Sequence, residues 1–132
     1  MAANSTDISV CARISELPRL MRALAEGTRQ LGIAEDIGLR VQLIVEELFT
    51  NTINHGHGGN DETSVSCRIA RQASGIVLRY TDAAPAYDMT LSPEQTASET
   101  MIGGLGIALI RGLSQDMRYT RQNDLNICEI RV

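Results

Sequence analysis

The most informative absence in this chain of 132 residues is lysine, because all twelve of its basic residues are arginine. A Walker A loop needs its lysine on the nucleotide phosphates, and a protein-kinase fold needs a lysine on one of its strands. Schiff-base and serine–lysine mechanisms also depend on a lysine amine. The sequence therefore excludes all of these chemistries.

Aromatic residues and positive charge are also scarce. The chain has no tryptophan, and its aromatic side chains are Phe49, Tyr80, Tyr87 and Tyr119. The formal net charge is −4 and the pI is about 5.1. A protein that follows nucleic-acid phosphates has a basic face, and single-strand binders stack bases on aromatic rings. We therefore expect no direct contact with nucleic acid.

The three cysteines, Cys11, Cys67 and Cys128, lie far apart and form no C-x-x-C pair, which argues against a zinc site. Each falls in a strand-like segment, so we expect buried free thiols. The first ten residues have no basic leader, and the longest nearly apolar run, residues 101–110, is too short to cross a bilayer. These features predict a cytoplasmic protein without a membrane segment.

Hydrophobic periodicity predicts one domain over residues 8–132, preceded by a frayed terminus over residues 1–7. The predicted order is strand, helix, helix, strand, strand, long connection, helix, strand, strand. Strands joined by short turns pair in antiparallel fashion. Three helices are too few to cover both faces of such a sheet well, so we expect them to pack on one face. The expected fold is thus a two-layer α+β sandwich with a mixed, mostly antiparallel sheet and three helices on one face. The element boundaries are predicted near 8–14, 15–31, 37–54, 63–71, 76–81, 105–113, 117–121 and 126–132.

The second predicted helix carries polar residues beside its apolar stripe. Glu47, Asn51 and His55 are spaced four apart, so they share one side of a helix. One interpretation is local hydrogen bonding near the helix end. The other is a carboxylate and an amide facing a cleft, where the amide oxygen suits Mg²⁺ and the carboxylate can act as a general base. For His55 a structural role at the helix end is favoured, and His57 is expected on the surface of a glycine-rich loop.

Two later segments have candidate binding chemistry. Asp82 ends an apolar strand, where it either begins a turn or accepts a hydrogen bond from an exocyclic amine. The segment Gly103–Gly106 (G-G-L-G) opens the third predicted helix, which we expect to begin at Leu105. Such a glycine turn is either an ordinary helix start or an anion site formed by backbone amides and the helix dipole.

The order of these segments resembles the GHKL ATPase superfamily with its Bergerat ATP-binding fold. The sequence has E-L-F-T-N-x-x-x-H on a helix, a strand that ends in aspartate, a polar connection and then G-G-L-G. Within that superfamily the chain looks most like the bacterial anti-sigma-factor serine-kinase family, and the resemblance extends from about Ile8 to Val132.

The resemblance implies a role for each matched residue. Glu47 would be the general base that activates the attacking hydroxyl; Glu46 is an alternative base, but it points away from Asn51 on a helical wheel. Asn51 would bind Mg²⁺ beside the phosphates, and Asp82 would accept the adenine amino group. The remaining implied contacts are backbone amides on the phosphates from Gly103, Gly104, Leu105 and Gly106, and an ATP lid over residues 89–102.

The chain departs from the family pattern at two places. Ala84 and Ala86 stand where the family has glycines after the aspartate, which restricts close backbone approach near the adenine. Residues 88–104 contain no basic residue, and Ile102 stands where many relatives have an arginine. The nearest cation in sequence is Arg111. Because phosphoryl transfer depends on positive charge around the moving group, ATP binding is better supported than turnover.

The resemblance predicts an ATP- and Mg²⁺-dependent serine/threonine protein kinase that acts on an anti-sigma-antagonist (STAS-type) protein. It also implies sequestration of a sigma factor, and it suggests a homodimer. One alternative is a non-catalytic, nucleotide-gated binding module of the same fold. Another is an isolated histidine-kinase-like ATPase domain that works with a separate phosphoacceptor protein. Phe49 and Met89 are candidate anchors for a partner, although core packing is the more ordinary role for both.

Overall fold

The computed structural model describes residues 4–73, 75–88, 90 and 100–132. The described elements are five strands, three α-helices, a 3-10 turn and a π-helical turn. The strands are β1 (Ser5–Cys11), β2 (Ser64–Gln72), β3 (Gly75–Asp82), β4 (Asp116–Gln122) and β5 (Leu125–Arg131). The helical elements are α1 (Leu17–Gln30), α2 (Glu35–Asn51), α3 (Thr100–Leu113), the 3-10 turn η1 (Ile14–Glu16) and the π-helical turn η2 (Thr52–His57).

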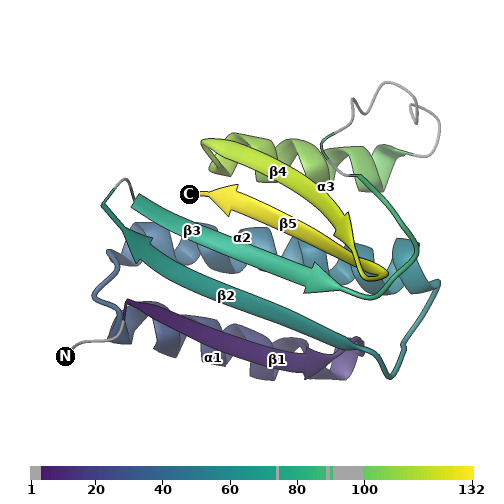
Figure 1. Ribbon diagram of the computed structural model, residues 1–132, viewed down its shortest axis with the longest axis horizontal. Coiled ribbons are helices and arrows are strands. Elements are labelled where there is room, and N and C mark those ends of the chain that lie inside the picture. Colours follow the sequence, from purple (N-terminus) through teal and green to yellow (C-terminus); the bar gives the residue numbers. More distant parts are fainter. Residues whose placement is uncertain (1–3, 74, 89, 91–99) are drawn as a thin grey trace.

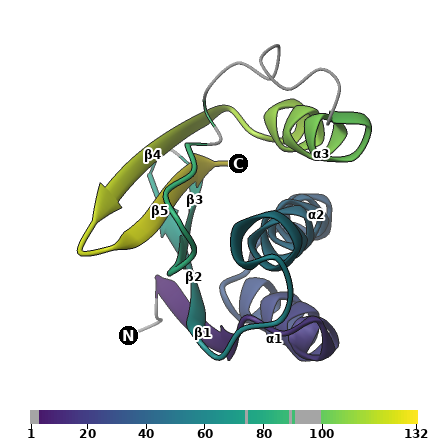
Figure 2. The same ribbon diagram turned by 90° about the vertical axis from the view of Figure 1, so that its right-hand side faces the viewer.

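The strands form one sheet in the order β1-β2-β3-β5-β4, and every pairing between neighbours is antiparallel (Figure 1). The three α-helices lie side by side on one face of this sheet, with α2 between α1 and α3 (Figure 2). The predicted two-layer α+β fold is therefore confirmed. The described sheet is antiparallel throughout, whereas we expected a mixed one. Strands β1 and β4 form its two edges.

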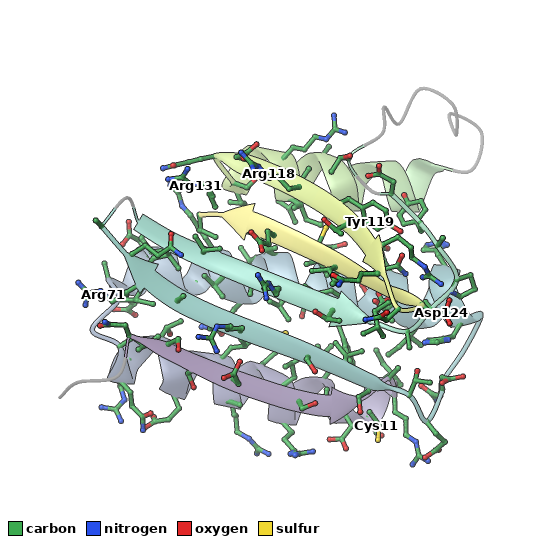
Figure 3. The ribbon with its side chains drawn as sticks, viewed as in Figure 1. Cys11, Arg71, Arg118, Tyr119, Asp124 and Arg131 are labelled. Carbon is green, nitrogen blue, oxygen red and sulfur yellow. The ribbon has the colours of Figure 1, made fainter. Side chains whose placement is uncertain are left out.

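The sheet alternates apolar and polar side chains, as a sheet with one covered face requires. In β2, for example, Val65, Cys67 and Ile69 are buried toward the helices, while Ser66 and Arg68 are exposed. The open face is polar and holds two cross-strand ion pairs, Asp7–Arg68 and Arg79–Glu129. Figure 3 shows this face with the side chains drawn. No helix within the described ranges is long and apolar enough to cross a membrane.

The core lies between the sheet and the three helices, and Ile110 supplies its α3 side. Leu20 and Leu24 supply its α1 side, and Phe49 of α2 is completely buried. Full burial of Phe49 in this core excludes the idea that it anchors a partner at the surface. Met89, the other candidate anchor, lies outside the described residues.

Two turns have the conformations that their residues favour. Gly32 ends the α1 region with a φ of +70°, which suits glycine. Asn123 and Asp124 join β4 to β5 with φ values of 53° and 62°. Positive φ at both central residues is the geometry of a tight hairpin turn, and asparagine and aspartate tolerate it better than most residues.

The structure corrects three predicted boundaries. β1 begins at Ser5, so residues 5–7 belong to the sheet rather than to a frayed terminus; residues 1–3 lie outside the described residues. The second helix is α-helical to Asn51 and then π-helical, whereas we expected one regular helix to residue 54. The third helix begins at Thr100 instead of Leu105. The last two differences both fall at the candidate site.

Candidate functional site

Helices α2 and α3 meet at the two polar residues singled out on α2. A methyl group placed on Gly106 would lie 2.6 Å from Oε2 of Glu47 and 3.7 Å from Nδ2 of Asn51. Only a glycine therefore lets α3 approach these side chains without displacing one of them. The structure brings Glu47, Asn51 and Gly106 together, although they come from segments more than 50 residues apart in sequence.

The side chains of Glu47 and Asn51 make no hydrogen bond to another described residue. Both are half-buried. A carboxylate offers acceptor oxygens, and an amide offers one acceptor oxygen and two donor hydrogens. Polar groups at a packed helix interface normally find partners, so this pair is available for a ligand.

The π-helical turn directly after Asn51 aims Thr52 at the sheet. The hydroxyl of Thr52 lies 2.8 Å from Oδ2 of Asp82 and 2.7 Å from the hydroxyl of Tyr80. It also lies 2.9 Å from the backbone carbonyl of Leu48. Because π-helical turns change which side chains face a neighbour, they are frequent at functional sites. Here the turn places Thr52 within hydrogen-bonding distance of Asp82 at the end of β3.

Burial raises the pKa of Tyr80 well above its ordinary value, and the nearby Asp82 carboxylate raises it further. The phenol therefore stays protonated and can donate its hydrogen to the oxygen of Thr52. Thr52 then has its single hydrogen to donate, and both Oδ2 of Asp82 and the carbonyl of Leu48 lie within reach of it. This chain of hydroxyls can supply Asp82 with a donor from the helix side of the site, and such chains strengthen one another when buried.

Asp82 itself is buried, with 8% of its surface exposed. Its Oδ1 accepts hydrogen bonds from the amide N–H of Ala84 at 3.1 Å and from Nδ2 of Asn126 at 2.8 Å. Asn126 is the register partner of Asp82 on β5. The carboxylate thus has a fixed orientation, with two donors on Oδ1 and Thr52 on Oδ2. One acceptor position on Oδ2 is left unused by the described residues.

Ala84 packs against the π-helical turn. A methyl group placed on Gly56 would lie 2.7 Å from Cβ of Ala84. The extra methyl of Ala84 is therefore accommodated because residue 56 has no side chain. The contact fixes the segment after Asp82 against the segment after Asn51.

The glycine segment of α3 differs from the predicted turn. Because α3 begins at Thr100, residues Gly103–Gly106 lie inside the helix. An α-helix leaves only its first few amides without intrahelical partners, so the later amides of this segment are committed to the helix. Contact between these amides and phosphates, which stays a prediction, would require the first turns of α3 to open. Within the predicted lid, residues 89 and 91–99 lie outside the described residues.

The two histidines exchange their predicted roles. His55 lies in the π-helical turn with its side chain exposed, so it does not continue the line of Glu47 and Asn51. The spacing argument assumed a regular α-helix, which ends at Asn51. His57 is the partnered one: its Nε2 lies 3.1 Å from the hydroxyl of Thr63, and its Nδ1 lies 3.6 Å from Oδ2 of Asp61. It therefore stabilises the glycine-rich loop.

The residues present fit a nucleotide with a single metal ion. The described residues contain no group of three histidine, cysteine or carboxylate side chains that could hold a metal by themselves. One amide oxygen, from Asn51, suits Mg²⁺ when phosphates supply further ligands, because Mg²⁺ keeps several waters and uses few protein ligands. The side chains of Glu47 and Asn51, which meet at Gly106 and bond to no described side chain, leave donors and acceptors for such a group.

The cysteines take no part in this chemistry. Cys67 and Cys128 are buried, and Cys11 is half-buried. Burial raises the pKa of Cys67 to about 12, and burial together with Asp88 and Asp82 raises the pKa of Cys128 to about 12. Both therefore remain neutral thiols at physiological pH and are poor nucleophiles.

Several site residues were missed by sequence reasoning, and they share a function as partners of Asp82 or its neighbours. Thr52 follows Asn51 directly and could have been noticed as a polar residue at the apolar edge of the helix. Asn126 could have been found only with the pairing of β3 and β5. The missed residues are Thr52, Gly56, Tyr80, Tyr119, Arg121 and Asn126.

A family model described as "Histidine kinase-like ATPase domain" matches residues 10–132, which is nearly the whole chain. No curated protein matches the chain significantly. The matched range includes both halves of the site, Glu47 and Asn51 on α2 and Asp82 at the end of β3.

Proposed function

The chain belongs to the histidine kinase-like ATPase domain family, and on that premise we propose that it is an ATP-dependent regulatory protein kinase. Its substrate would be a serine or threonine hydroxyl of an anti-sigma-antagonist (STAS-type) protein, and a sigma factor would be a second partner. The family supports an ATP-binding module. The kinase activity, its protein substrate and the use of Mg²⁺ are parts of the proposal.

One observation carries this proposal: a carboxylate and an amide that bond to no described side chain meet at Gly106, and Thr52, the residue after that amide, holds the buried Asp82. Asn51 would hold Mg²⁺ through its amide oxygen. Asp82 would accept a hydrogen bond from the amino group of adenine. Bound ATP would supply the phosphoryl group, and Glu47 would take the proton from the attacking hydroxyl at its carboxylate.

Phosphorylation would act as a switch on the protein partner. A phosphate adds about −1.5 to −2 charges at neutral pH, which is enough to disrupt a docked interface by repulsion and desolvation. This chain is itself acidic, with a formal net charge of −4, so a newly phosphorylated partner would be repelled further. The modification would therefore release one partner and leave the surface for another.

A second candidate function is a nucleotide-gated binding module without phosphoryl transfer. Residues 88–104 have no basic side chain, and phosphoryl transfer depends on positive charge. Arg111, the nearest cation in sequence, donates a hydrogen bond from Nη2 to the carbonyl of Thr90 at 2.8 Å. This contact uses the guanidinium to position the start of the predicted lid segment.

The test is incubation with labelled ATP, Mg²⁺ and a candidate STAS protein from the same genome. We expect label on a serine or threonine of that protein. Glu47→Ala should reduce transfer by about 10²–10⁴-fold, the usual contribution of a general base, with ATP affinity nearly unchanged. Asn51→Ala should weaken binding of ATP in the presence of Mg²⁺.

The matched control is Glu46→Ala, which removes the neighbouring carboxylate on a different side of α2 and should retain transfer. If Glu46→Ala abolishes transfer while Glu47→Ala does not, the assignment of the base is wrong. ATP binding without any labelled partner would favour the nucleotide-gated module. Absence of ATP binding would refute both functions.

A further inference from the structure

A row of polar side chains crosses the last three strands at the end of the sheet nearest Asp82. Asp82 of β3 pairs in register with Asn126 of β5, and Asn126 pairs with Arg121 of β4. Side chains of register partners lie on the same face of a sheet, and here that face is the one covered by helices. Figure 3 labels Tyr119 on β4 and Asp124 in the turn that precedes Asn126. The row therefore leads from the edge strand of the sheet to the candidate site.

The partners of Asn126 determine which way its amide points. Its Oδ1 accepts hydrogen bonds from the hydroxyl of Tyr119 at 2.5 Å, from Nη1 of Arg121 at 3.2 Å and from the amide N–H of Tyr87 at 3.3 Å. A guanidinium and a backbone N–H can only donate, so the amide oxygen must face them. With 9% of its surface exposed, Asn126 has little access to water that could satisfy the opposite orientation.

The other end of the amide consequently donates to the segment that follows β3. Nδ2 of Asn126 donates to Oδ1 of Asp82 at 2.8 Å, to the carbonyl of Ala84 at 3.0 Å and to the carbonyl of Pro85 at 3.1 Å. Arg121 also donates from Nη1 to the carbonyl of Ala84 at 2.9 Å. The buried amide of Asn126 thus holds both the carboxylate of Asp82 and the backbone of Ala84 and Pro85.

This arrangement decides which position of Asp82 remains for a ligand. A carboxylate has about four acceptor positions. Asn126 and the amide of Ala84 occupy both on Oδ1, and Thr52 occupies one on Oδ2. The position left on Oδ2 can only accept a hydrogen bond. An amino group on a purine satisfies it, whereas a carbonyl at the same ring position would oppose it with a second acceptor.

We propose that Asn126, anchored by Tyr119 and Arg121, is the positioning residue that makes this site select a 6-aminopurine over a 6-oxopurine. The inference rests on the proposed ATP binding and deepens it. Asn126 acts through Asp82: it fixes the rotation of the carboxylate, so the open acceptor always faces the base. Without Asn126 the remaining described partners of the carboxylate are Thr52 and the amide of Ala84. Both of its oxygens can then exchange places and accept water or a different ligand group.

The test compares binding of ATP and GTP in the presence of Mg²⁺, measured by calorimetry on the full chain. In Asn126→Asp the new carboxylate keeps the acceptor that faces Tyr119, Arg121 and Tyr87. Its second oxygen now faces Oδ1 of Asp82, and two carboxylates at that distance share a proton. The variant also loses both hydrogens of the Asn126 amide, so Asp82 and the carbonyls of Ala84 and Pro85 lose the donor that orients them. We expect the preference for ATP over GTP to fall by at least about tenfold.

The matched control is Asn123→Asp, which makes the same change of charge in the β4–β5 turn, three residues away. Its φ of 53° is one that aspartate tolerates, and its preference for ATP should stay within about twofold of the unaltered chain. If Asn126→Asp does not fold, Tyr119→Phe removes a single hydroxyl from the anchor of Asn126 and keeps the ring. We expect a smaller fall in the preference for ATP, about threefold, in this variant.

Hydrogen exchange without nucleotide gives an independent readout of the same network. The amides of Ala84 and Tyr87, which are bonded to Asp82 and Asn126, should exchange faster in both variants. Faster exchange with an unchanged ATP preference would show a structural role only and would overturn the inference. An unchanged preference together with unchanged exchange would do the same. If the unaltered chain binds neither nucleotide, the proposed function fails and the inference fails with it.

Discussion

The contact between Gly56 and Ala84 gives a sharp test of how the site is packed. In Gly56→Ala the new methyl would lie 2.7 Å from Cβ of Ala84, whereas methyl groups in contact prefer about 3.5–4.0 Å. The two segments would have to separate by about 1 Å, and overpacking of this kind costs about 1–3 kcal/mol. The φ of Gly56 is not positive, so alanine gains back about 0.4–1 kcal/mol through the unfolded state. The net expectation is a loss of about 1–2 kcal/mol in the free energy of unfolding.

Equilibrium unfolding in urea measures this loss, together with the double variant Gly56→Ala/Ala84→Gly. Removing the methyl of Ala84 relieves the clash, so the double variant should be more stable than the sum of the single effects by about 1–2 kcal/mol. Gly112→Ala is the matched control. A methyl there meets no described atom within 4 Å, and in a helix it should stabilise the chain by about 0.5–1 kcal/mol. Unchanged stability in Gly56→Ala, or additive effects in the double variant, would refute the packing argument.

Three further predictions concern the junction of the helices, the core and the buried thiols. Gly106→Ala should displace the flexible Glu47 carboxylate that lies 2.6 Å from the new methyl, lowering phosphoryl transfer at least about tenfold while unfolding in urea changes by less than about 1 kcal/mol. Normal transfer would show that Glu47 need not occupy this position. Phe49→Ala should cost about 3–5 kcal/mol in thermal or urea unfolding, because the ring is completely buried; a loss under about 1 kcal/mol would contradict its place in the core. Cys67 and Cys128 have their pKa raised from 9.0 to about 12, so the folded state retains protons that the unfolded state loses above pH 9. Under reducing conditions the free energy of unfolding should fall by about 2–3 kcal/mol between pH 8 and pH 10, and Cys67→Ala should remove about half of that fall; a flat profile would refute the assignment.

Local sequence patterns were sufficient for most of the fold. Alternation of apolar residues located the strands, and the residues at the turns, Gly32, Asn123 and Asp124, have the positive φ values that their types favour. The helical start at Thr100 could not be predicted in the same way. Glycines usually weaken helices, and the requirement for a small residue at position 106 arises from Glu47 and Asn51, which are distant in sequence.

The candidate site could be predicted only in part from the sequence, for a similar reason. Glu47, Asn51 and Asp82 could be selected because each is a polar residue at the end or edge of an apolar segment. Their supporting partners come from pairings that no local pattern encodes. The strand order places β5 between β3 and β4, so Asn126 reaches Asp82 only after a long connection and a helix have been crossed. The π-helical turn likewise redirects Thr52 and His57 in a way that regular helical spacing does not reveal.

The edge strand β4 contributes to the candidate site, because its Tyr119 and Arg121 bond to Asn126. No described strand pairs with its outer edge, so the backbone donors and acceptors there could pair with another strand. A change in the twist of β4 would move Tyr119 and Arg121, and with them the amide of Asn126 and the carboxylate of Asp82. The opposite rim, β1, has no such connection among the described hydrogen bonds. Tags, crosslinks or partner proteins attached along β1 should leave the geometry around Asp82 unchanged. The same attachments along β4 should disturb it.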